Sequence, residues 1–382
     1  MTVSRTPLSA VLPPLILGTA TFNVQYNTDP KQMPYTDIIR RALANSVTGF
    51  DTSPYYGPSE ILLGDALRQL TPPPSRDGYF LVTKVGRIRG DEFDYSPSWI
   101  QYSIARSLER LGTKYLDLVY AHDAEFVSPQ EVLTAVKELR RLRDQGLVRY
   151  VGISGFPVEV LATLAEYIFR ETGEPLDAVL SYGHYCVQNS QLGQENLLKR
   201  FQSAGVNCVL NASMLGMGLL TTKGVDNLPM ASWHPAPPEL RIACNNLAKI
   251  AASHDQTLEE VSIRWALQNW ARVGAPFGTK AGRASRIGVS VMGVSTVEEL
   301  DETCELWDSI ASETPSQQAL QARKTTTQMV EQEMWPALGE WKDYAWESGG
   351  VSFVNTRTNK GHVPNDEIAQ RWGLVSVAMP KI

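Results

Sequence analysis

Residues 49–60 read Gly-Phe-Asp-Thr-Ser-Pro-Tyr-Tyr-Gly-Pro-Ser-Glu, and an apolar run that begins at Val47 leads into them. The run is typical of a short buried strand, the following Ser, Pro and Gly residues are typical of a loop, and Glu60–Gln69 has helical spacing of its apolar residues. This stretch therefore predicts a strand, a loop and a helix in direct succession, with an aspartate at the end of the strand.

The same succession of strand, loop and helix recurs along the chain. Strands are predicted at Leu15–Leu17, Val47–Phe50, Tyr79–Thr83, Leu116–Ala121, Leu147–Ile153, Ala178–Tyr182, Val206–Leu210 and Ile287–Met292, with helices between them, among them Tyr35–Ser46 and Ser98–Leu111. Parallel strands need crossover helices, so this alternation favours a closed (β/α)8 barrel of the α/β class. A doubly wound sheet is the alternative, but it would carry a GxGxxG phosphate loop after an early strand, and only Gly216-Met217-Gly218 comes near that pattern.

Two segments and a tail interrupt the alternation. Thr221–Pro238 is expected to form a long loop over the barrel mouth, and Ala271–Arg286 a flexible basic insertion. We expect the barrel to span residues 13–310. Residues 311–382 contain Trp335, Trp341, Trp346 and Trp372, so this extension is expected to pack on the barrel, partly through a helix near Thr326–Trp341.

Composition narrows the class of protein. The chain has 382 residues, 43% hydrophobic and 20% charged, with a net charge of −6, which is typical of a globular protein without a nucleic-acid partner. No apolar run is long enough to span a membrane, and Met1–Leu12 lacks the apolar core of a signal peptide. The four cysteines are far apart and lack metal-ligand spacing, so we expect reduced, packed thiols in the cytoplasm and no metal. The oligomeric state is left open.

Four polar residues at the ends of early strands suggest the chemistry: Asp51, Tyr56, Lys84 and His122. The carboxyl ends of barrel strands converge on one mouth, so these side chains are expected to meet. A nearby ammonium would lower the pKa of the Tyr56 phenol, Asp51 would hold Lys84 in place, and a neutral His122 would orient a substrate oxygen. The residues thus predict a proton-transfer site.

The spacing Asp51–x4–Tyr56, followed by Lys84 and His122, resembles the signature of the aldo-keto reductases. The resemblance extends over Leu15–Ile310 and includes the stretches at residues 106–118 and 146–154. It implies a barrel that binds NAD or NADP without a Rossmann fold, with Tyr56, Lys84, Asp51 and His122 as the catalytic residues. Residues 180–185, 218–220 and 233–236 are similar to the sugar 1-dehydrogenases of that family.

The resemblance also implies binding residues. The cofactor would contact Gly18, Thr19, Asp51, Ser154, Ser181, Ser213, Leu215, Gly216, Gly218, Gly293, Ser295, Glu298 and Glu299, and the substrate Tyr55, Tyr56, His122 and His184. The chain departs from the family at Gly155, where many members have Asn, at Ser181, where they have Gln, and at about Ala212, where they have the Tyr that stacks on the nicotinamide. Ser295 stands where NADP-binding members carry a basic residue, so NAD is expected rather than NADP, although Arg283 and Arg286 could fold back onto a phosphate.

These observations predict an oxidoreductase that oxidises C1 of an aldose, such as D-arabinose or L-galactose, to the lactone. Two alternatives stay open at this point. One is an NADPH-dependent reductase of the carbonyl group of a secondary metabolite, and the other is a barrel that binds the nucleotide as a regulatory subunit without turnover. A small-molecule carbonyl or sugar is the expected partner.

Overall fold

The computed structural model describes residues 5–375, and its centre is a closed barrel of eight parallel strands in the order β1 to β8. The strands are β1 Leu15–Gly18, β2 Gly49–Asp51, β3 Phe80–Val85, β4 Leu116–His122, β5 Val148–Gly155, β6 Ala178–Tyr182, β7 Cys208–Ala212 and β8 Val289–Gly293. The pairing of β1 with β8 closes the ring. The predicted (β/α)8 barrel is confirmed, and the doubly wound sheet is excluded.

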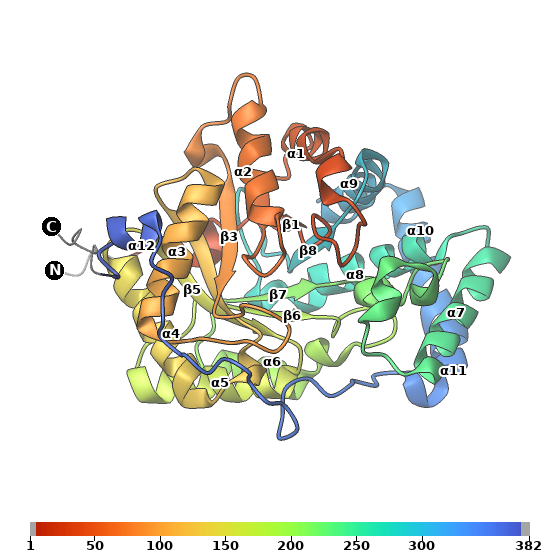
Figure 1. Cartoon of the computed structure of the whole chain (residues 1–382). Coiled ribbons are helices and arrows are strands. Elements are labelled where there is room, and N and C mark those ends of the chain that lie inside the picture. The colour runs from red at the N-terminus through yellow and green to blue at the C-terminus, as the bar shows by residue number, and fades with distance from the viewer. Residues whose placement is uncertain (1–4, 376–382) are drawn as a thin grey trace, which may run out of the picture.

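Helices surround the barrel (Figure 1). They are α1 Tyr35–Ala44, α2 Ser59–Gln69, α3 Pro97–Leu111, α4 Pro129–Asp144, α5 Val158–Thr172, α6 Glu195–Ser203, α7 Pro238–Ser253, α8 Leu258–Val273 and α9 Val297–Ala311, followed by α10 Gln317–Met329, α11 Trp335–Leu338 and α12 Glu367–Arg371. Local signals set several of their ends. Ser128 and Glu131 form a reciprocal capping box at the start of α4, and Gly112 ends α3 in the left-handed conformation (φ 66°).

Seven of the eight strands contribute to two cores, because successive side chains in a strand point to opposite faces, and β2 contributes only Phe50, to the outer core. Ile16, Leu118 and Leu210 belong to the core inside the barrel, whereas their strand neighbours pack outward against the helices. Leu8 and Leu12, in and just after a short 3-10 turn, belong to the inner core and close the barrel at the amino ends of the strands. With that end filled by apolar side chains, the opposite end is left for a site.

The C-terminal extension packs on the barrel and runs across one side of it. After α10 and α11 the chain passes along the lower edge of Figure 1 and reaches α12 beside α3. We call residues 342–366 the strap. The strap is held at the barrel by Asn355, whose side chain both accepts from the backbone N–H of Phe93 and donates to its carbonyl. The helix expected near Thr326–Trp341 is present but begins earlier, at Gln317.

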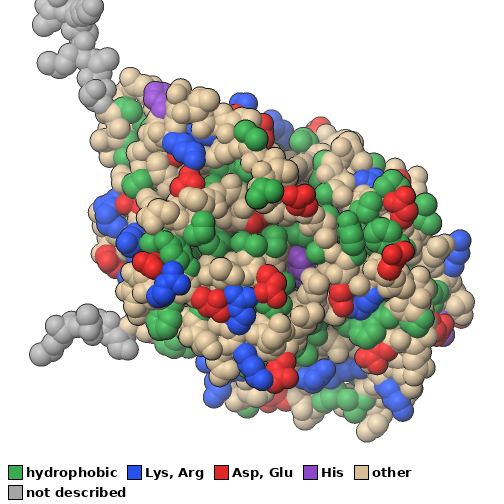
Figure 2. Space-filling view, turned by 90° about the horizontal axis from the view of Figure 1, so that it is seen from below, with side chains coloured by type: hydrophobic (Ala, Val, Ile, Leu, Met, Phe, Trp, Pro, Cys, Tyr) green, Lys and Arg blue, Asp and Glu red, His purple; other side chains and the backbone are tan. Residues whose placement is uncertain are grey.

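The expectation for the four cysteines can be checked directly. All four cysteines are free and buried, as expected for packed thiols. Within residues 5–375, no helix is long and apolar enough to cross a membrane, and no cluster of His, Cys, Asp or Glu side chains could hold a metal ion. Acidic and basic side chains are interspersed over the face shown in Figure 2.

The basic insertion does not lie near the mouth. Arg286 donates to Ser9 Oγ and Arg283 to the carbonyl of Ala311, and Ser9 N in turn donates to Asn207, directly before β7. The insertion therefore lies at the amino ends of the strands. The alternative in which Arg283 and Arg286 bind a cofactor phosphate is wrong, because the length of the barrel separates them from the carboxyl ends.

Candidate active site

The carboxyl ends of the strands surround a cavity of about 1390 Å³. Its lining includes the last residues of β2, β4, β6, β7 and β8, together with Trp346 from the strap and Trp233 from the loop over the mouth. This volume exceeds the 300–1,000 Å³ that is usual for one small ligand, so it has room for a dinucleotide together with a substrate. The Thr221–Pro238 segment contributes to the lining, as predicted for a loop over the mouth.

The four residues predicted to meet all line this cavity. Lys84 lies within β3, one residue before its end, and its Nζ donates to Asp51 Oδ1 at 2.5 Å and to the carbonyl of Thr52 at 3.0 Å. Nζ also lies 4.8 Å from the centre of the Tyr56 ring. Both Lys84 and Asp51 are almost fully buried, so the ion pair is shielded from water and the ammonium is held in one position next to Tyr56.

The two ring nitrogens of His122 have different neighbours, Ser53 for Nδ1 and Asp123, at 3.6 Å, for Nε2. Its Nδ1 lies 3.1 Å from Ser53 Oγ, which already accepts from the backbone N–H of Tyr55. The Ser53 hydroxyl can therefore donate to Nδ1, which assigns the proton of the neutral ring to Nε2. Tyr56 lies edge-on to the ring at 5.7 Å.

Burial lowers the pKa of His122 to about 3, with Lys84 and Arg87 acting in the same direction and Asp123 opposing them. The imidazole is therefore neutral across the physiological range. Burial also raises the pKa of Tyr56 well above its ordinary value, and the carboxylates of Asp51 and Asp123 add to this effect. The prediction of a lowered pKa for Tyr56 is wrong for this arrangement, because burial and the two carboxylates outweigh the neighbouring positive charge of Arg87.

The predicted cofactor residues divide into two groups. Those that line the cavity are Gly18, Asp51, Ser154, Ser213, Leu215, Gly218, Gly293, Ser295 and Glu299. Ser154 Oγ is buried and has no hydrogen-bond partner among the described residues. An orphaned hydroxyl on the wall of a cavity fits the amide of a nicotinamide, which can both donate and accept hydrogen bonds.

Five other predicted contacts are not part of the cavity lining. Thr19 and Ser181 are fully buried and bond to Asp51 O and to Phe156 O. Gly216 turns its carbonyl to His234 Nε2 at 3.0 Å, and Glu298 is exposed in the first turn of α9.

His184 is the fifth of these residues. It is buried and stacks on Phe156, with ring centres 4.2 Å apart. The prediction that it contacts substrate is therefore not supported, because its ring is enclosed by the protein.

The structure adds lining residues that the sequence did not single out. Arg87 and Asp123 form an ion pair on the cavity wall, and Gln25, Tyr26 and Asn27 line it from the loop after β1. A signal for Asp123 was available, since it directly follows His122 at a strand end. Arg87 lies beyond the end of β3 in an irregular segment, where no periodicity indicates the direction of a side chain.

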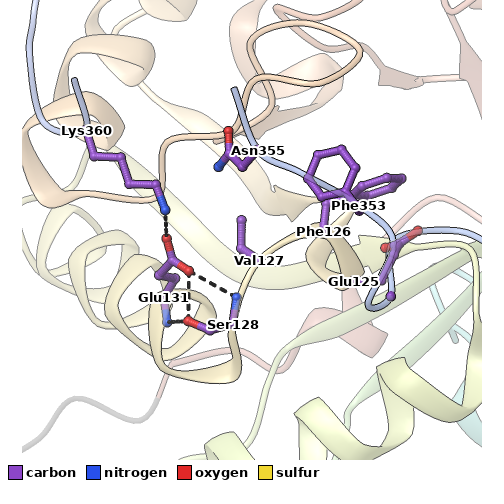
Figure 3. A pocket seen from close by; sticks show the side chains of 9 residues that line it. Glu125, Phe126, Val127, Ser128, Glu131, Phe353, Asn355 and Lys360 are labelled. Carbon is purple, nitrogen blue, oxygen red and sulfur yellow. Dashed lines mark hydrogen bonds and ion pairs between the residues drawn. The ribbon is translucent and has the colours of Figure 1, made fainter. Parts of the chain in front are cut away.

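A smaller cavity of about 280 Å³ lies between the strap and the start of α4 (Figure 3). Lys360 pairs with Glu131 at one side, and the rings of Phe126 and Phe353 meet at the other, 4.7 Å apart. None of the four predicted catalytic residues lines it, so it belongs to the attachment of the strap.

A barrel with this buried Asp, Tyr, Lys and His arrangement at its mouth defines a class of oxidoreductases. Residues 14–317 match the model of the aldo/keto reductase family. The chain belongs to this family, and it is an oxidoreductase that uses a nicotinamide cofactor.

Two relatives and one solved structure place the chain more closely. It is 40% identical to D-arabinose 1-dehydrogenase of Saccharomyces cerevisiae over 79% of this chain and 85% of the relative. It is 32% identical to L-galactose dehydrogenase of Arabidopsis thaliana over 78% of this chain and 86% of the relative. The structure of a glycerol dehydrogenase from Gluconobacter oxydans superimposes with a TM-score of 0.56 at 20% identity, covering 83% of this chain and 92% of that one, and this likeness concerns the fold alone.

Proposed function

We propose that this protein oxidises the C1 hydroxyl of an aldose, such as D-arabinose or L-galactose, to the corresponding lactone. The observation that carries the proposal is the Lys84–Asp51 ion pair set against Tyr56 and His122 in one buried cavity. The two sugar dehydrogenases among the relatives support the choice of an aldose. The bound nicotinamide supplies the hydride acceptor.

His122 and Tyr56 have different roles at the substrate oxygen. His122 Nε2–H donates to the substrate oxygen and holds it near the Tyr56 hydroxyl, and Tyr56 takes the proton from that oxygen during oxidation. Tyr56 holds its proton in the free protein, because burial, Asp51 and Asp123 raise its pKa and outweigh the opposing charge of Arg87, so oxidation requires Tyr56 to lose that proton before it takes the proton of the substrate hydroxyl. In the reverse direction the protonated Tyr56 donates directly.

Replacing Tyr56 with Phe tests this role. The variant keeps the ring and its packing but removes the proton donor, so we expect turnover to fall by about 10²–10⁴-fold. Cofactor affinity, measured by fluorescence titration, should stay within about twofold. Tyr102→Phe is the matched control, because it removes a hydroxyl on α3 that bonds to Asp366, outside the cavity lining. Near-wild-type turnover by Tyr56→Phe would contradict the assignment.

We further propose that NAD is preferred to NADP. Three observations support this choice at the amino end of α9. Ser295 carries no charge, its N–H already donates to Glu299 Oε2 at 2.7 Å, and Glu302 and Glu305 also line the cavity. A 2′-phosphate placed here would meet carboxylates, whereas a free ribose hydroxyl could donate to one.

One set of measurements separates the alternatives. Initial rates are compared for a panel of aldoses with NAD and a panel of aldehydes and ketones with NADPH. Faster carbonyl reduction with NADPH would favour the carbonyl reductase. Quenching of fluorescence by NADH without turnover of any substrate would favour a binding subunit.

A further inference from the structure

The wall beside His122 carries a buried carboxylate that the proposed reaction does not use. Asp123 is 1% exposed, lines the cavity, and has left-handed backbone torsions (φ 55°, ψ 60°). Such torsions are strained for a residue with a side chain, and they persist where the surroundings require them. Tyr95 contributes to this, because its hydroxyl donates to the carbonyl of His122 at 2.5 Å.

One oxygen of Asp123 is paired and the other is not. Oδ2 accepts from Arg87 Nη1 and lies 3.6 Å from His122 Nε2. Oδ1 is buried and has no hydrogen-bond partner among the described residues. Burial by itself would raise the pKa of Asp123, but the charge and hydrogen bond of the Arg87 guanidinium, with the charge of Lys84, oppose it and the pKa is lowered. A buried carboxylate with an unused acceptor atom is costly unless a ligand donates to it.

Arg87 is held rigidly next to this carboxylate. Its guanidinium carbon lies 3.9 Å from the centre of the Tyr55 ring, 5.5 Å from that of Phe93 and 5.6 Å from that of Phe126. Of its five N–H donors, the described hydrogen bonds use one for Asp123 and one, at 3.4 Å, for the carbonyl of Arg89. The cavity wall thus offers an acceptor and donors side by side.

We propose that Asp123 and Arg87 form the subsite that binds the hydroxyl groups of an uncharged sugar. This inference rests on the proposed function. Asp123 Oδ1 accepts from the hydroxyl on the carbon next to the reacting one, because Asp123 adjoins His122, which holds the oxygen on C1. Arg87 donates to a further hydroxyl.

The charges specify the class of sugar. Lys84 is paired with Asp51, and Arg87 with Asp123, so both the ammonium and the guanidinium next to the Tyr55–Tyr56 segment are already neutralised. Glu347, from the strap, adds another acidic side chain to the lining. Beside His122, a phosphorylated or carboxylated sugar would meet Asp123 and find Arg87 already paired. The remaining lysine of the lining, Lys223, is an exposed residue of the loop over the mouth. The subsite therefore favours neutral aldoses over sugar phosphates and uronic acids.

The test is Asp123→Asn, which keeps the side chain's size and removes its charge. Kinetics are measured with the best aldose, its 2-deoxy analogue and its phosphate ester. A charged hydrogen bond contributes on the order of 1.5–3 kcal/mol, so KM for the aldose should rise roughly 10–150-fold while kcat changes much less. KM for the 2-deoxy analogue should rise less than about threefold. The variant should use the phosphate ester better than the wild type does, since Arg87 is no longer neutralised.

Asp94→Asn is the matched control. Asp94 is equally buried and pairs with Arg357 at 3.4 Å, but it does not line the cavity, so the ratio of KM values for the aldose and its analogue should stay unchanged. Cofactor titration shows that each variant is folded. If the wild type oxidises an aldose but Asp123→Asn discriminates against the 2-deoxy analogue as strongly as before, the subsite is overturned and the proposed function stands. If the wild type oxidises no aldose, both the subsite and the proposed function are contradicted.

Discussion

At residue 155 the chain has glycine where many aldo/keto reductases have asparagine, and the structure gives a steric reason. Gly155 is the last residue of β5, and a Cβ placed there would overlap Oε2 of Glu125. Glu125 Oε1 accepts from the backbone N–H of Phe156 at 3.0 Å and from Ser348 Oγ at 2.9 Å. The carboxyl group of Glu125 therefore takes the space of a side chain on β5 and attaches the strap there.

This steric relation predicts coupled effects on stability. Gly155→Asn should destabilise the protein by about 1–3 kcal/mol, as is usual for overpacking a filled site. Glu125→Ala also destabilises, because the Phe156 N–H loses its partner. The double variant should be more stable than the sum of the single effects by at least about 0.5 kcal/mol, since the introduced asparagine side chain fills the space that the glutamate vacates. Denaturant unfolding of all four proteins measures the coupling, and strict additivity would contradict the steric overlap.

At the scale of the element, the amino end of α9 already binds a carboxylate of the same chain. Thr296 caps the helix by accepting from the N–H of Glu299, and the Glu299 side chain returns to the N–H of Ser295. A helix amino terminus attracts anions through its free N–H groups and its dipole. Because Glu299 already uses this terminus, it opposes the binding of a cofactor phosphate at the same place.

Ser295→Arg should shift the preference towards NADP. An arginine at this position supplies a charge-assisted bond on the order of 1.5–3 kcal/mol, so the ratio of the two dissociation constants should change roughly tenfold to more than a hundredfold. Ser295→Gln, with a long uncharged side chain, is the control and should change the ratio little. Tighter binding of NADP than NAD by the wild-type protein would show that our interpretation of α9 is wrong.

At the scale of the whole molecule, the strap joins parts of the barrel that are distant in sequence. Trp346 stacks on Phe156 at 4.6 Å and contacts His234 edge-on at 5.2 Å. Ser348 bonds to Glu125, and Asn355 to Phe93. Through these contacts the strap forms one wall of the cavity, and the family match, which ends at residue 317, does not include it.

The attachment at Glu125 should make stability depend on pH. Burial raises the pKa of Glu125 to about 8, and the nearby Asp123 adds to the shift. Between about pH 4.5 and pH 8 the folded protein therefore holds a proton that the unfolded chain has lost, so rising pH lowers stability across this window. Relative to Glu125→Gln, the wild type should lose at least about 1.4 kcal/mol of unfolding free energy between pH 5 and pH 9, the equivalent of one pKa unit.

Glu131→Gln is the control for this experiment. Hydrogen bonds to Lys360 and Ser128 more than offset burial and lower the pKa of Glu131, so its contribution is present above about pH 4.5 and is lost only below it. The stability difference between this variant and the wild type should be constant from pH 5 to pH 9. An equally constant difference for Glu125→Gln would show that Glu125 is ionised in the folded protein.

The barrel and the meeting of Asp51, Tyr56, Lys84 and His122 could be predicted from the amino-acid sequence. Strand and helix periods are local, and parallel strands in a closed barrel must bring their carboxyl ends together, so residues far apart in sequence could be placed at one mouth. The strand limits were less accurate, as at β7, which runs from Cys208 to Ala212 rather than from Val206 to Leu210.

Which side chains face the cavity could not be predicted in the same way, because it depends on the packing of the whole chain. Asp123 is turned towards it by left-handed torsions that no periodicity indicates, whereas His184, close to the end of β6, is buried and stacks on Phe156. The pKa of Tyr56 likewise depends on burial and on the carboxylates of Asp51 and Asp123. Contacts such as Ser348 with Glu125 join residues more than two hundred positions apart, and packing of this kind is settled by the whole folded chain rather than by any local pattern.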